Sequence, residues 1–108
     1  MNRAGAPFMT EAVKAEAAAR ITAVAKAMTE GRFGDDKVFV SHLYRAVYAA
    51  ETGFVETLEF FKEALLMLHC ERYLTLSRAD LVEAMDPRDV GESEIRHHGA
   101  VFNFLKVF

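Results

Sequence analysis

The spacing of apolar residues predicts a first helix between Thr10 and Met28. Apolar residues recur there at steps of three or four, which places them on one face of a helix. Thr10 is a suitable N-cap, and two glycines with an Asp pair in "EGRFGDD" (30–36) end the helix. The predicted inner face consists of Val13, Ala17, Ile21, Val24 and Met28.

The same spacing predicts a second and a third helix. "SHLYRAVYAA" begins with Ser41 as its N-cap and ends before the turn "ETGF" (51–54). "LEFFKEALLMLHCERY" follows Thr57, again a good N-cap. We expect these two helices to bury Leu43, Val47, Ala50, Leu58, Phe61, Leu65 and Leu68.

Short β-branched and aromatic runs predict strands between and after the helices. "KVFV" (37–40) lies before the second helix and "YLTL" (73–76) follows the third. The segment 93–108 contains two strand-like runs around "HHG", where Gly99 can adopt the positive φ of a tight hairpin turn. The chain between them is expected to form a turn or short helix in "SRADLVEAM" (77–85) and a loop in "DPRDVGE" (86–92).

The composition of the chain indicates a single globular domain. The 108 residues are 52% hydrophobic, enough to build a single core. We expect a flexible tail over residues 1–9 and one domain over 10–108. The lone cysteine, Cys70, favours a reducing compartment, and no signal peptide or membrane span is indicated, so the expected location is the cytoplasm.

The predicted order of helix, strand, helix, helix, strand and hairpin resembles the winged helix-turn-helix family, from about Thr10 to Val107. The resemblance implies an α+β fold with three helices, a small antiparallel sheet and a C-terminal hairpin. In that family the third helix reads DNA and the hairpin forms the wing. The expected function is therefore that of a small DNA-binding regulator that docks on duplex DNA by its third helix and wing.

A DNA-contacting surface needs cations near that helix and wing. The histidines of "RHHG" would strengthen the contact below about pH 6.5, although three polar residues also fit an ordinary solvent-exposed turn. The candidate contacts are Ser41, Arg45, Lys62, Arg72, Arg78, Arg96, His97 and His98.

Charge favours an alternative function on the same scaffold. The net charge is −3, and the third helix sets Lys62 against Glu59, Glu63 and Glu71. Carboxylates repel phosphates, so this helix is a poor DNA-reading surface. The alternative is a protein–protein interaction module, such as an adaptor or a small acidic phage or defence-related protein.

The C-terminal strand "AVFNFLKVF" is apolar on both faces, with only Asn103 and Lys106 interrupting it. Either the domain covers both faces, in which case all the aromatics are core, or one face meets a partner or a second copy in a homodimer. The partner-facing residues would be Phe102, Phe104 and Phe108.

The sequence predicts neither a metal site nor a catalytic site. His69 and Cys70 are adjacent, so on a helix they point about 100° apart and do not form a metal site together. No nucleophile with a base, glycine-rich phosphate loop or apolar carboxylate pair stands out. We expect a protein that is not an enzyme and that uses no metal, no cofactor and no small-molecule substrate.

Overall fold

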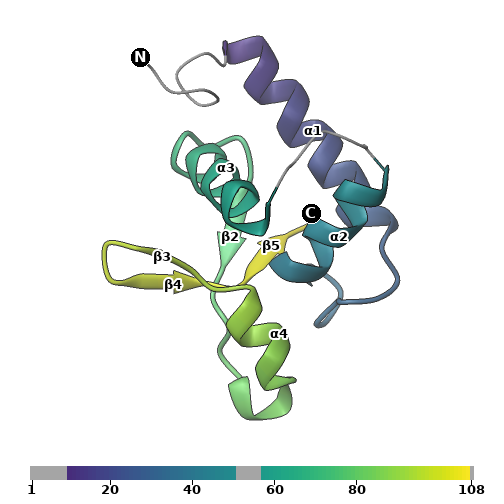
Figure 1. Ribbon diagram of the computed structural model, residues 1–108, viewed down its shortest axis with the longest axis vertical. Helices are drawn as coiled ribbons and strands as arrows, with labels where there is room; N and C mark the ends of the chain where they lie inside the picture. Colours follow the sequence, from purple (N-terminus) through teal and green to yellow (C-terminus); the bar gives the residue numbers. More distant parts are fainter. Residues whose placement is uncertain (1–9, 51–56, 108) are drawn as a thin grey trace.

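A computed structural model describes residues 10–50 and 57–107 of the chain (Figure 1). The predicted tail, the "ETGF" turn and Phe108 lie outside these residues. The α+β class is confirmed, with four α-helices and two small antiparallel sheets in the described part of the chain. In chain order the elements are α1 (Glu11–Ala27), β1 (Lys37–Phe39), α2 (Val40–Ala50), α3 (Leu58–Cys70), β2 (Thr75–Ser77), the 3-10 helix η2 (Val82–Ala84), α4 (Pro87–Glu92), β3 (Ile95–His97), β4 (Ala100–Phe102) and β5 (Phe104–Lys106).

Two of the three predicted N-caps are confirmed. Thr10 Oγ1 accepts a hydrogen bond from Val13 N at 3.2 Å, and Thr57 Oγ1 accepts one from Phe60 N at 3.0 Å. Each bond satisfies a backbone N–H that has no partner within its helix. Local sequence therefore determines where α1 and α3 begin.

The third predicted cap, Ser41, is wrong because α2 begins one residue earlier, at Val40. Val40 N donates to the carbonyl of Asn103 at 3.1 Å, and Ser41 N donates to Ser93 Oγ at 3.0 Å. The free N–H groups at the start of α2 are thus satisfied by residues more than fifty positions away along the chain.

The predicted loop at 86–92 is also wrong, because most of it forms α4. The Asp86 side chain accepts a hydrogen bond from Arg88 N at 2.9 Å, and Pro87 occupies the first helical position. Both are standard helix-starting features, since Asp caps free N–H groups and Pro lacks the N–H that would remain free.

The central sheet has the order β1-β5-β2, and a separate hairpin joins β3 to β4. The hairpin turn is confirmed: His98 and Gly99 both have positive φ, at 49° and 83°. Figure 1 shows this hairpin projecting beneath α3, with α4 at the end of the molecule away from α1. The single C-terminal strand expected from the sequence is wrong, because the chain passes from one sheet to the other at Asn103.

Two apolar clusters cover the two faces of the central sheet. The larger packs α1, α2 and α3 against Val38, Leu76 and Leu105. The smaller contains Phe39, Met85 and Phe104, with Phe33, Ala79 and Val90 packed against it. The fourth helix supplies Val90 and so helps to cover the face that three helices would have left open.

Candidate functional site

The exposed surface of α3 is acidic and aromatic. Glu59, Phe60 and Glu63 face solvent, while Phe61 and Leu65 face the core. We call the first three residues the acidic face of α3. Phe60 is 43% exposed, which is unusual for so large an apolar side chain inside a helix that buries its other aromatic residue.

The predicted DNA-contacting lysine of α3 is largely covered and already lies beside a carboxylate. The side chain of Lys62 is only 12% exposed, and its ammonium lies 3.9 Å from the carboxylate of Glu59. A phosphate backbone that approached α3 would therefore meet carboxylates first.

The predicted wing contacts lie on the hairpin, but they do not extend the surface of α3. Arg96 is exposed and donates to Glu94 Oε1 at 3.1 Å. His97 is paired with Ala100 across the hairpin and lies 3.7 Å from Cys70 of α3, from Nε2 to Sγ. Because side chains alternate along a strand, Arg96 lies on the hairpin face opposite to the one that contacts α3. The ring of His98 packs against that of His97, with centroids 4.1 Å apart.

The remaining predicted DNA contacts are distributed over other parts of the molecule. Arg45 points outward from α2 and lies 3.8 Å from Glu92 of α4. Arg78 is exposed in the segment after β2, and Arg72 lies between α1 and β2. Ser41 is completely buried and has no access to DNA in this structure. The predicted contacts therefore do not form one continuous basic surface.

The predicted partner-facing aromatics also lie in different places. Phe104 is completely buried in the smaller core, with its ring 4.7 Å from that of Phe39, so it has no surface to offer a partner. Phe102 is partly buried against the larger core, and its ring lies 4.9 Å from that of His69. The fourth helix and the break at Asn103 are the reasons that these residues do not form one exposed strand face.

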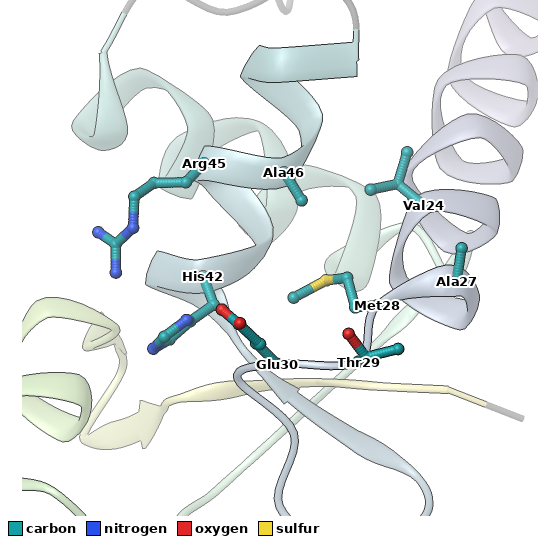
Figure 2. A pocket seen from close by; sticks show the side chains of 8 residues that line it. All are labelled: Val24, Ala27, Met28, Thr29, Glu30, His42, Arg45 and Ala46. Atoms are coloured by element: carbon teal, nitrogen blue, oxygen red, sulfur yellow. The ribbon is translucent and has the colours of Figure 1, made fainter.

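A cleft of about 650 Å³ lies between the end of α1 and α2 (Figure 2). Val24 and Met28 reach into it from α1, while Arg45 extends from α2 to the side away from α1. His42 also lines it, but its Nε2 is already 3.0 Å from Asp89 Oδ1 of α4. Two of the polar groups here, His42 and Arg45, thus already have partners on α4, and the cleft offers a substrate little directed chemistry.

A second hollow, between the end of α3 and the hairpin, gathers His69, Cys70 and His97. His69 Nδ1 accepts a hydrogen bond from Leu76 N at 3.1 Å, which requires a neutral ring and covers an outward-facing N–H of the edge strand β2. Burial lowers the pKa of His69, and the nearby His97 lowers it further, while a backbone hydrogen bond at Leu74 opposes them. Within the described residues no group of three or more His, Cys, Asp or Glu side chains is placed to hold a metal ion.

A polar clamp joins the start of α1 to the end of α3. Lys14 Nζ donates to Glu71 Oε1 at 2.6 Å, and the hydroxyl of Tyr73 donates to Glu11. The hydrogen bond that Lys14 donates to Glu71 raises the pKa of Lys14 above its usual value, against a smaller opposing effect of burial. The clamp fixes α1 beside the chain that leads from α3 to β2.

Beside this clamp, α1 and the α3–β2 turn enclose a groove that contains Lys26, Arg72 and Lys106. We call it the basic groove. Only Arg72 was singled out from the sequence. The sequence gives little indication that the other two belong to a site, because Lys26 lies on the polar side of a predicted helix and Lys106 interrupts a predicted strand. Their proximity depends on the packing of α1 against the sheet, which no local pattern encodes.

None of the helices in the described ranges is long and apolar enough to cross a membrane. No family model matches the chain, and no curated protein and no solved structure is found to be similar to it.

Proposed function

We propose that this chain is a non-enzymatic protein-interaction module on a winged-helix-like scaffold, and that it contacts its partner through the acidic face of α3. The order of its elements supports the scaffold: a helix, a strand, two helices, a strand and a hairpin follow one another, with α4 inserted before the hairpin. Fold alone does not determine function, so the support for the function comes from the exposed residues of α3.

The observation that carries the proposal is the composition of the exposed side of α3. A large aromatic side chain, Phe60, is exposed beside two carboxylates, Glu59 and Glu63. Aromatic residues are enriched at the centres of protein interfaces, and charged residues around them select the partner. Tyr48, at 48% exposure near the end of α2, is a second exposed aromatic residue. The matching partner surface is apolar at its centre and carries Lys or Arg at its edge.

Docking on DNA through α3 and the hairpin stays a prediction, and the geometry supports it less. Lys62 is largely covered, Arg96 and Arg45 lie next to carboxylates, and Ser41 is buried. A cation that already lies beside a carboxylate gains less from a phosphate, because the existing interaction must be weakened first.

Photo-crosslinking tests the proposal directly. A photo-reactive phenylalanine derivative is placed at position 60, and the full chain is irradiated in extract of its source organism. The same group at position 88, on the exposed surface of α4, is the matched control. We expect one dominant protein product from position 60 that is absent from position 88 and is lost with the double variant Glu59→Lys and Glu63→Lys. Equal products from both positions, or none from position 60, would contradict the proposal.

A further inference from the structure

The basic groove is a continuous depression along one side of α1. Two adjoining hollows, of about 540 and 300 Å³, share Thr22, Lys26, Arg72 and Tyr73. One part is lined by the small side chains of α1, chiefly Ala15, Ala19 and Ala23. The other part opens between Lys26, Arg72 and Lys106. Lys26 and Arg72 line both hollows, so the groove combines an apolar wall on α1 with cations beside it.

No carboxylate lines either hollow, although the chain as a whole is acidic. Within residues 10–50 and 57–107, Lys26 and Arg72 take part in no ion pair, in contrast to Lys14 in the neighbouring clamp. Lys106 is brought to the same groove by the pairing of β2 with β5, where it lies opposite Thr75. Lys26 and Arg72 in a concave site produce a positive potential, and the field is focused by the surrounding low-dielectric protein.

The backbone conformation of Arg72 is a second observation in favour of a binding site in the groove. Arg72 has a φ of 70°, a conformation that glycine adopts at no steric cost and other residues rarely adopt. Tyr73 N donates to Leu68 O at 2.8 Å and Arg72 N to His69 O at 3.0 Å, which is the hydrogen-bond pattern of a Schellman helix end. Glycine is the usual residue at this point of the motif. An arginine at this position costs backbone strain, but it places a guanidinium in the groove.

The shape and charge favour a peptide over a nucleic acid. A phosphodiester backbone needs cations spaced along its length, whereas this groove gathers Lys26 and Arg72 beside an apolar wall of α1. A guanidinium binds a carboxylate through two parallel hydrogen bonds, and small side chains on α1 allow a bound backbone to approach closely. A short segment with one or two carboxylates followed by small apolar residues matches both parts of the groove.

We propose that the basic groove binds an acidic peptide segment of a protein partner, with a carboxylate held by Arg72 and Lys26 and apolar side chains lying along Ala19 and Ala23. This site is separate from the acidic face of α3. It adds a second contact of opposite charge to the proposed interaction module.

The test uses the full chain labelled with ¹⁵N and titrated at low salt with a short capped peptide in which two Glu residues precede a run of Ala. We expect amide shifts concentrated at Lys26, Arg72, Thr75 and Lys106. Arg72→Gly should weaken binding at least about tenfold, because it removes a charge-assisted hydrogen bond, while the fold stays intact. Arg88→Gln removes the same charge from α4 and serves as the control, with unchanged binding expected.

Four outcomes would overturn the proposal: no shifts in the groove, shifts centred elsewhere, equal binding by Arg72→Gly and the wild type, or tighter binding of a short duplex DNA than of the peptide at these same residues. Phe60→Ala distinguishes this site from the α3 surface, because it should leave peptide binding unchanged. Failure of the peptide titration together with successful crosslinking from position 60 would remove the groove proposal alone.

Discussion

Polar side chains have different roles on two sides of this molecule. On the α4 side, which we define as α4 with Ser41, His42, Asn103 and Phe104, the polar groups bond to one another across the chain. Ser41 N bonds to Ser93, His42 to Asp89, and the Asn103 amide donates to Val90 O at 2.9 Å. On the α1–α3 side, which comprises the basic groove and the acidic face of α3, Glu63, Lys26 and Arg72 make no ion pair within the described residues.

This difference separates polar groups that stabilise the fold from those that remain available to a partner. A buried polar group without a hydrogen bond is costly, so the interior bonds of the α4 side are needed for folding. Exposed charges contribute little to folding stability. Substitutions on the α4 side should therefore lower the free energy of unfolding, and those on the α1–α3 side should change binding instead.

The largest effect is expected for Phe104→Ala. Removing a completely buried Phe side chain should lower the free energy of unfolding by about 3–5 kcal/mol, measured by urea denaturation. Phe60→Ala is the matched control, and it should cost less than about 1 kcal/mol because its side chain is already partly in water. Equal losses for the two variants would remove the distinction between the two sides.

A smaller loss of folding stability is expected for Ser93→Ala. This change leaves the buried Ser41 N–H at the start of α2 without an acceptor, at a cost of about 1–3 kcal/mol. Ser77→Ala, at a half-buried serine on β2, should alter stability by no more than about 0.5 kcal/mol. A neutral result for Ser93→Ala would mean that the Ser41–Ser93 pair does not help to hold α4 on α2.

Arg72→Gly is expected to stabilise the protein, in contrast to Phe104→Ala and Ser93→Ala. Glycine relieves the positive φ at the end of α3 and should raise the free energy of unfolding by about 0.5–1 kcal/mol. The loss of a cation from the negative end of the helix offsets a part of this. The control is Arg72→Ala, which also removes the charge but keeps the backbone strain. Comparing the thermal denaturation of the two variants separates the backbone effect from the effect of the charge. A lower melting temperature for the glycine than for the alanine variant would contradict the assignment.

The smallest effect is a pH dependence through His69. Burial lowers its pKa in the folded state, so between that lowered value and about 6.5 the unfolded chain binds more protons than the folded chain. Stability should therefore fall as the pH drops below about 6.5. His69→Gln should flatten this part of the profile. Parallel profiles for the wild type and His69→Gln would contradict the role of His69 at the edge of β2.

Local signals in the sequence predicted the elements that local chemistry determines. Thr10 and Thr57 cap their helices, and Gly99 turns the hairpin, because each acts within three or four residues of itself. Asp86 and Pro87 give the start of α4 the same kind of signal, but proline also breaks helices, and the loop predicted at 86–92 reflects that second property.

The features that the sequence did not predict depend on distant partners. The cap of α2 comes from Ser93, and the C-terminal strand ends and restarts at Asn103, whose backbone bonds to Val40 and Ser77. The candidate sites follow the same rule. The acidic character of α3 could be read from Glu59 and Glu63, whereas the basic groove forms only when α1 packs beside the α3–β2 turn.

Whether α3 docks on DNA is decided by a fluorescence-anisotropy titration of mixed-sequence duplex DNA at low and moderate salt, on protein whose mass in solution is known from light scattering. We expect no salt-dependent binding by the wild type, and a gain of binding at low salt when Glu59→Lys and Glu63→Lys reverse the charge of α3. Binding by the wild type that falls steeply with salt and is weakened by Arg96→Ala would contradict it, and would restore α3 and the hairpin as a DNA-docking surface.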